Sequence, residues 1–314
     1  MTLKLIKKLS NIRNNIVWFY LIKFLIMPFY SLIWKYFINF EGRFLYILFH
    51  SYKKIDQNFS LKHSKNDKII IQNNIGLEKI SKLINDNIVK KDLLKISNQN
   101  LTSGKHDRSK NKYKSGSNAY VDDLFENLDD NIKEEIIKFA VSHEIYLSAS
   151  EYMGVIPVIA KINVLYNIPN KTNIPRASML WHKDDFGYKS LDLFLAISDI
   201  NENNGPLEFV EKKNPLGIFY KIKSSLNNQD SGQRNKISDS QFTQYFKSDD
   251  LGKFTGKQGS GILIDSFSVY HRGGNCLSNY RLVLRISYQT PDSYTLSNRD
   301  KSYFIKFLKD EKIH

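Results

Sequence analysis

The sequence predicts a mainly β protein, a sandwich or barrel of jelly-roll type, with flanking α-helices and a helical N-terminal appendage. Two observations carry this prediction. Residues 155–290 contain at least six short runs rich in Ile, Val, Leu, Phe and Tyr, each bounded by Gly, Asn, Asp or Pro. Residues 71–154 show helical apolar spacing instead. Six strands at this spacing are typical of double-sheet or closed β folds.

The composition limits the possible functions. The 314 residues are 41% hydrophobic and 25% charged, which suits one large domain with an appendage or two modest domains. The single cysteine, Cys276, excludes an internal disulfide and indicates a reducing compartment. The net charge of +14 lies in residues 1–115, which hold 19 Lys and 3 Arg against 7 acidic residues. Because no recognisable module presents this charge, we expect no nucleic-acid partner.

The N-terminal segment is apolar and basic. Residues 16–34 contain 16 apolar residues of 19, interrupted by Lys23, Pro28 and Ser31. Basic residues on both sides favour no orientation across a membrane. Three interpretations stay open: a helical hairpin on an anionic membrane surface, packing on the protein's own core, and a true span. We expect a cytoplasmic protein whose residues 1–50 contact the inner face of a membrane peripherally.

Helical elements come next along the chain. Residues 1–70 are read as the N-terminal segment with a polar linker, and residues 71–314 as the domain. Apolar spacing predicts a helix over 76–97, and a polar, turn-rich stretch predicts a surface loop over 98–118. Residues 122–154 read as two helices, with Gly154 as a C-terminal stop.

The β core is expected over residues 155–290. Turn-rich residues 214–241 interrupt it as an insertion of helix and loop, and a C-terminal helix is expected over 296–312. The predicted strands are 155–167, 177–184, 191–200, 206–210, 259–271 and 281–290.

The stretch LWHKDDFG (180–187) holds the candidate site. Side chains at i and i+2 of a strand point to the same face, so His182 and Asp184 project together. Burying an imidazole beside a carboxylate is costly unless both share a partner, and a metal ion is such a partner. The third ligand is expected from His271, at the end of a later strand. Two His and one Asp on one face of an octahedral ion form the facial triad of non-haem Fe(II) oxygenases.

An arginine completes this interpretation. The triad leaves three coordination positions open, which suit a bidentate 2-oxo acid and O2. The far carboxylate of such an acid requires a cationic clamp, and the Arg fork matches it best. Arg281 lies ten residues after His271 at the start of the next strand, while Arg285 shares its strand parity and stays an alternative clamp.

These residues resemble the phytanoyl-CoA dioxygenase family of Fe(II)/2-oxoglutarate oxygenases. The H-x-D pair, the later His and the Arg ten residues beyond match the family's order, and the similarity covers roughly residues 120–290. LWHKDDFGYKSLDLFLAISDINENNGPLEFV (180–210) and HRGGNCLSNYRLVLRISY (271–288) carry it. The family often has Pro-Gly-Ser-His after the Asn-Gly turn, where this chain has EKKNP, and no metal ligand is lost by this departure.

The resemblance implies a double-stranded β-helix (jelly-roll or cupin-like) and an enzyme that uses Fe(II), 2-oxoglutarate and O2. His182, Asp184 and His271 would bind iron, and Arg281 would bind 2-oxoglutarate. The expected reaction is hydroxylation of a small-molecule, lipid or envelope-related substrate with release of succinate and CO2, without an obligate protein partner. Two alternatives stay open: another metal enzyme on a cupin-type barrel, which would not need Arg281, and a non-catalytic membrane-associated binding module, which would not need the triad.

Overall fold

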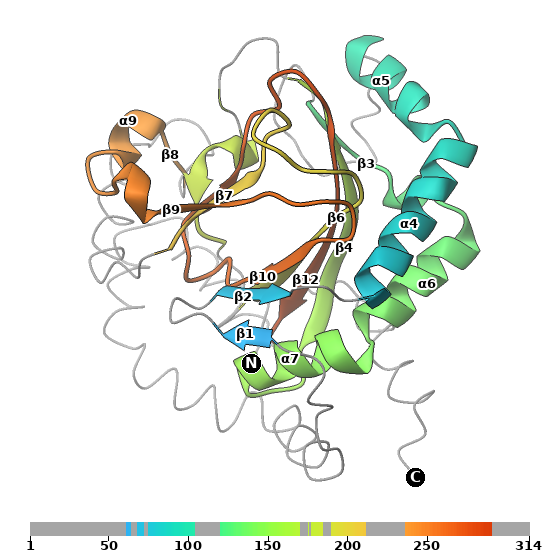
Figure 1. The fold of residues 1–314 in the computed structure, drawn as a ribbon, viewed down its shortest axis with the longest axis horizontal. Coiled ribbons are helices and arrows are strands. Elements are labelled where there is room, and N and C mark those ends of the chain that lie inside the picture. Colours follow the sequence, from blue (N-terminus) through green and yellow to red (C-terminus); the bar gives the residue numbers. More distant parts are fainter. Residues whose placement is uncertain are drawn as a thin grey trace, which may run out of the picture.

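The computed structural model describes residues 61–63, 68–71, 75–103, 120–169, 175, 177–184, 190–211 and 236–290. The apolar segment 16–34, most of the insertion over 214–241 and the helix expected over 296–312 lie outside these residues. The described residues form two antiparallel sheets, with most of the helices on the outer face of one of them (Figure 1).

The larger sheet has seven strands, and the smaller has five. The larger sheet runs in the order β1 (Leu61–His63), β2 (Lys68–Ile71), β10 (Gly261–Ile264), β6 (Ser190–Ala196), β12 (Arg281–Gln289), β4 (Val158–Asn167) and β3 (Val121–Asp123). The smaller sheet runs in the order β8 (Lys236–Ile237), β5 (Trp181–His182), β11 (His271–Gly273), β7 (Leu207–Val210) and β9 (Leu251–Phe254).

The strand connections confirm the predicted fold class. From β4 to β7, and again from β9 to β12, each strand lies in the opposite sheet from the strand before it. This alternation winds the chain around both sheets as a jelly roll, or double-stranded β-helix. Inward-facing residues of both sheets form the apolar layer between them: Phe194, Ala196, Leu207, Phe209, Phe254, Ile262, Ile264 and Val283.

Helices cover the outer face of the larger sheet (Figure 1). They are α4 (Ile75–Lys90), α5 (Leu93–Ser103), α6 (Asp130–Ala140) and α7 (His143–Met153). Alternate residues of β12 face them, and the Tyr288 hydroxyl donates to the Ala140 carbonyl of α6 at 2.7 Å. Since side chains alternate along a strand, the other residues of β12 face the space between the sheets.

Local backbone geometry sets the helix ends. The single helix predicted over 76–97 is divided between α4 and α5 at Asp92, whose φ of 53° is incompatible with a right-handed helix. Gly154 ends α7 in the left-handed conformation with φ 69°, as predicted, because glycine carries no Cβ penalty there. Short helical elements complete the description: η2 (Phe125–Asn127), η3 (Ala177–Met179), α9 (Asp239–Phe242) and η4 (Ser248–Asp250).

The start of the described chain differs from the prediction. Part of the expected linker forms strand β1, and β2 pairs with β10, so residues 61–63 and 68–71 extend the larger sheet. The short runs LKH and KIII were not predicted as strands, because pairing with a distant strand supplies their order. Among the described residues, no helix has the length and apolar character needed to cross a membrane.

Candidate metal centre

Two histidines face each other across neighbouring strands of the smaller sheet. His182 on β5 and His271 on β11 are direct partners in the antiparallel register. Their ring centroids lie 4.4 Å apart at an interplanar angle of 49°. The pairing places two imidazoles on one face of the sheet although they lie 89 positions apart in the sequence, and His271 was the ligand expected from a later strand.

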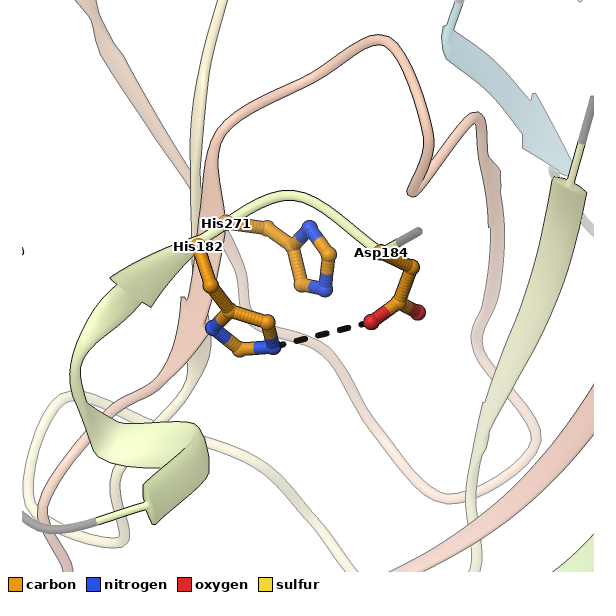
Figure 2. A group of neighbouring side chains, drawn as sticks. All are labelled: His182, Asp184 and His271. Atoms are coloured by element: carbon orange, nitrogen blue, oxygen red, sulfur yellow. Dashed lines mark ion pairs between the residues drawn. The ribbon is translucent and has the colours of Figure 1, made fainter. Parts of the chain in front are cut away.

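Asp184 completes the group, as predicted. It lies on the connection after β5, where its backbone N–H donates to the Ser266 carbonyl at 2.8 Å. Figure 2 shows its carboxylate turned toward the imidazoles, with Oδ1 3.8 Å from His182 Nε2. One ligand atom from each of the three residues lies within 4.8 Å of the other two. Ligands of one ion with bonds of about 2.1 Å lie roughly 3 to 4 Å apart, so small side-chain rotations would complete the coordination.

Backbone carbonyls fix the orientation of both imidazoles. His182 Nδ1 lies 2.7 Å from the Leu180 carbonyl, and His271 Nδ1 lies 3.1 Å from the Val269 carbonyl. Each carbonyl accepts only from a protonated Nδ1, which leaves Nε2 with a lone pair. A hydrogen bond of this kind selects the tautomer in which Nε2 binds a metal.

The charge state of the group also suits a cation. Burial, together with the neighbouring His271, lowers the pKa of His182 to about 3, so the imidazole is neutral at pH 7. Burial alone would raise the pKa of Asp184, but Arg285, both histidines and Lys161 together lower it below its usual value. The carboxylate is therefore ionised beside the neutral His182 imidazole, and together with the His271 imidazole it forms the donor set of a facial triad.

Arg285 on β12 is in direct contact with this group. Its Nη2 donates to Asp184 Oδ2 at 2.8 Å and to Asp192 Oδ2 at 2.7 Å. Asp192 lies on β6 with no exposed surface, and its other oxygen accepts from the Ser287 hydroxyl. Sequence reasoning placed Arg285 on the inner face but missed Asp192 and Ser287. The sequence signal that could have found them is strand parity, since both residues lie in predicted strands. In the structure they are register partners on the inner face of the sheet.

Arg281 lies on the same face of β12, and the structure gives it a different environment. The residue is 7% exposed, and its Nη1 is buried without a hydrogen-bond partner among the described residues. A Cβ added to Gly273 would lie 3.2 Å from Arg281 Nη2, so the guanidinium lies beside this glycine. Because Gly273 follows His271 by two strand positions, the guanidinium and the imidazole share one face of β11.

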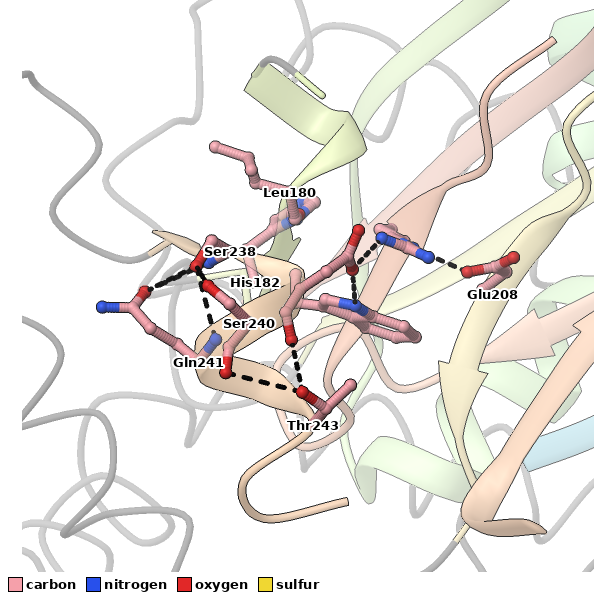
Figure 3. A network of polar contacts seen from close by, with 10 residues as sticks. Leu180, His182, Glu208, Ser238, Ser240, Gln241 and Thr243 are labelled. Atoms are coloured by element: carbon pink, nitrogen blue, oxygen red, sulfur yellow. Dashed lines mark hydrogen bonds and ion pairs between the residues drawn. The ribbon is translucent and has the colours of Figure 1, made fainter. Parts of the chain in front are cut away.

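The opposite face of the histidine strands carries a different cluster. Arg272 stacks on Trp181 with 4.5 Å from Cζ to the ring centroid, and Asp239 accepts from both. Arg272 Nε also donates to Glu208 Oε2 at 2.6 Å. Figure 3 shows this network and the start of α9, where a capping box between Ser238 and Gln241 fixes the turn. The segment that begins at β8 thus covers the outer side of the histidine strands.

Cys276 lies near Arg281 but is not activated. Burial raises the pKa of its thiol despite the neighbouring guanidinium, so the thiol stays protonated. Its Sγ donates to the Asn204 carbonyl at 3.2 Å. The interpretation of Cys276 as a small buried loop residue therefore fits its environment.

A comparison with protein-family models finds no match, and a comparison with curated proteins finds none either. The resemblance to the phytanoyl-CoA dioxygenase family therefore stays a prediction.

Solved structures show remote similarity. AviO1 from Streptomyces viridochromogenes Tue57 is 14% identical over 73% of this chain and 91% of its own, with a TM-score of 0.44. The epimerase SnoN, in complex with Fe3+, alpha ketoglutarate and nogalamycin RO, is 15% identical over 73% and 81%, with a TM-score of 0.43. HygX from Streptomyces hygroscopicus, with nickel and 2-oxoglutarate bound, is 8% identical over 72% and 84%, with a TM-score of 0.41. At these values the function has to be inferred from the chain's own residues.

Proposed function

We propose that this chain is an Fe(II)- and 2-oxoglutarate-dependent dioxygenase. Its three metal ligands would be His182, Asp184 and His271, and Arg281 would bind the far carboxylate of 2-oxoglutarate. Two features inside one barrel support the proposal. The triad offers three converging donor atoms that suit a cation, and the buried Arg281 Nη1 has no hydrogen-bond partner among the described residues.

The position of Arg281 carries the proposal. Two residues along a strand span about 6.6 Å, so Arg281 beside Gly273 lies roughly that far along β11 from His271. A five-carbon 2-oxo acid bound to the metal through its oxo-acid end can reach across such a gap with its second carboxylate. A buried cation without a partner is costly, and a charge-assisted pair with this carboxylate would satisfy it.

Each residue has a defined task in this proposal. The imidazoles present Nε2 because their Nδ1 protons are held by backbone carbonyls. Asp184 supplies the negative charge, and Arg281 orients the co-substrate. The low exposure of the site, 13% for His182 and 11% for Asp184, limits access of water to the reacting atoms. When bound, the iron supplies O2 activation coupled to oxidative decarboxylation of 2-oxoglutarate to succinate and CO2.

The alternative functions explain less of the site. A hydrolase or isomerase on the same barrel would use the triad with another ion, but it would give no task to Arg281. A metal-free binding module would not need two imidazoles with Nε2 directed at one carboxylate. We therefore infer an oxygenase, with a small-molecule, lipid or envelope-related substrate as the proposed class.

We propose further that residues 1–50, which lie outside the described residues, hold a cytoplasmic enzyme on the inner face of an anionic membrane. The segment carries seven basic residues and one acidic residue, and each basic residue near such a surface contributes about 1 kcal/mol. Deleting residues 1–50 should release the protein from anionic liposomes while 2-oxoglutarate turnover stays measurable. Full-length protein that ignores these liposomes would contradict the proposal, as would protein that resists both high salt and carbonate extraction.

The dioxygenase proposal is tested by anaerobic titration of the full chain with Fe(II) and then 2-oxoglutarate. We expect the weak visible charge-transfer band of a chelated 2-oxo acid to appear only when both are present. If Fe(II) binds but the band does not appear with 2-oxoglutarate, the result would favour another metal enzyme. Absence of Fe(II) binding would overturn the proposal.

A further inference from the structure

Arg285 binds a metal-ligand candidate and a second buried carboxylate through one nitrogen. Its Nη2 donates at 2.8 Å to Asp184 Oδ2 and at 2.7 Å to Asp192 Oδ2. The Arg285 side chain is 16% exposed, and Asp192 has no exposed surface. In such an environment, charge-assisted hydrogen bonds are strong and directional.

The two oxygens of Asp184 therefore differ. Oδ1 lies 3.8 Å from His182 Nε2, on the side of the imidazoles, whereas Oδ2 is bound by Arg285. The terminal torsion of an aspartate is broad and nearly two-fold, so an unrestrained carboxylate exchanges its oxygens easily. A carboxylate that is free to turn can also chelate a metal through both oxygens.

We propose that Arg285 is a positioning residue that withholds Asp184 Oδ2 from the metal, so that Asp184 binds through Oδ1 alone. This inference rests on the proposed metal centre. Single-oxygen binding by Asp184 leaves three positions of an octahedral ion open, which is what a bidentate 2-oxo acid and O2 together require. Binding through both oxygens would take one of those positions.

Three contacts hold Arg285 in this place. Asp192 accepts from the same nitrogen, and Ser287 donates to the other oxygen of Asp192. The Arg285 guanidinium also lies over the Phe194 ring, with 5.6 Å from Cζ to the centroid. Since Ser287 and Asp192 are register partners across β12 and β6, the barrel backbone itself sets the guanidinium position. Arg285 is therefore preorganised before any metal binds.

Their spacing along β12 separates Arg285 from Arg281. Four positions along β12 place their Cα atoms about 13 Å apart. Arg281 lies beside Gly273, whereas Arg285 contacts Asp184. The two arginines on one strand face thus act on different partners: Arg285 on the metal ligand and Arg281 on the co-substrate.

The test is anaerobic titration with Co(II), whose visible spectrum reports its coordination, followed by titration with 2-oxoglutarate. Arg285→Gln keeps a polar side chain but loses the fork and the charge. We expect it to raise the Kd for Co(II) about 10- to 100-fold, the usual effect of removing a group that orients a metal ligand, and to change the Co(II) spectrum. Arg281→Gln, on the same strand face, should leave the Kd for Co(II) within about threefold and raise that for 2-oxoglutarate.

Two conservative variants complete the series. Arg285→Lys keeps the charge at this position, so we expect a smaller increase in the Kd for Co(II) than with Arg285→Gln. Asp192→Asn removes the second carboxylate without changing its shape, and should give an increase of only a few-fold. If Arg285→Gln fails to fold, the Kd values and Co(II) spectra of these two variants decide the question. A Kd and a spectrum equal to those of the parent in both variants would overturn the inference.

The inference and the proposed function fail in different ways. If the parent protein binds no Co(II), the metal centre itself is wrong. If the parent binds Co(II) and 2-oxoglutarate but folded Arg285→Gln has the same Kd and spectrum for Co(II), Arg285 does not position Asp184. If Arg285→Gln weakens only 2-oxoglutarate binding, Arg285 is the clamp, and the inference is overturned in favour of the alternative assignment.

Discussion

Among the described residues, two arginines each bind two carboxylates. One arginine lies inside the barrel, and the other lies on the outer face of the smaller sheet. Inside the barrel, Arg285 contacts Asp184 and Asp192. On the outer face of the histidine strands, Arg272 contacts Glu208 and Asp239. The number of charged partners is the same, but the surroundings differ: Asp192 has no exposed surface, whereas the Asp239 side chain is 52% exposed.

This difference supports the inner of these two clusters as the candidate metal centre. Water solvates the surplus negative charge of the outer cluster, so such a cluster contributes modestly to stability and needs no further ion. In the inner cluster little solvent reaches the surplus charge, and a cation bound by Asp184 and the two imidazoles would neutralise it. The inner carboxylate–arginine cluster therefore differs from the outer one both in its burial and in its two imidazoles.

The largest difference between the clusters is expected on removing one carboxylate from each. Asp184→Ala should abolish metal binding and 2-oxoglutarate turnover, because only the two imidazoles remain as ligands and the negative charge is lost. Asp239→Ala, the matched control, should keep both. Metal titration followed by succinate measurement gives the comparison. If Asp184→Ala binds Fe(II) and turns over like the parent protein, the triad assignment is wrong.

The next effect concerns the co-substrate. Arg281→Ala should raise the apparent KM for 2-oxoglutarate roughly 30- to 4,000-fold. The reason is that a buried charge-assisted pair worth about 2–5 kcal/mol is lost. Arg285→Ala should affect the KM for 2-oxoglutarate less. Steady-state kinetics at saturating Fe(II) measures both, and the opposite ranking would move the clamp to Arg285.

A smaller effect is expected in the outer cluster. Arg272→Ala removes the stacking on Trp181 and two ion pairs, one of them half-exposed, and should lower the free energy of unfolding by about 1–3 kcal/mol. The affinity for Co(II) should change less than with Arg285→Gln. Urea denaturation and Co(II) titration of the same variant test this. A loss of metal affinity as large as that of Arg285→Gln would mean that the outer cluster also shapes the site.

The smallest effect is pH-dependent. The pKa of His182 falls from 6.5 in the unfolded chain to about 3 in the folded one. The unfolded state therefore takes up a proton first, so stability is complete above pH 6.5 and falls as the pH drops toward 3. Between pH 7 and 5 the metal-free protein should lose about 1–2 kcal/mol. Urea denaturation at both pH values checks this, with His182→Gln as the control. An equal loss in that variant would contradict it.

Local patterns predicted the site better than its surroundings. His182 and Asp184 could be predicted from their close spacing, although Asp184 lies on the connection after β5, and Arg281 because its offset from His271 is short. The partners of Arg285 depend on the pairing of β6 with β12, which no local pattern encodes. The same limit applies to β1 and β2, because β2 pairs with the distant β10 and β1 pairs with β2. The division of the predicted 76–97 helix rests on one residue, Asp92, with positive φ.

The central claim is that one barrel face holds an iron with 2-oxoglutarate between the triad and Arg281. The most direct test is a crystal structure grown anaerobically with Fe(II) and 2-oxoglutarate, with anomalous data at the iron edge. We predict one iron peak bound by His182 Nε2, His271 Nε2 and Asp184 Oδ1, and a far carboxylate on the Arg281 guanidinium. An iron peak elsewhere, or a far carboxylate held by Arg285, would contradict this account.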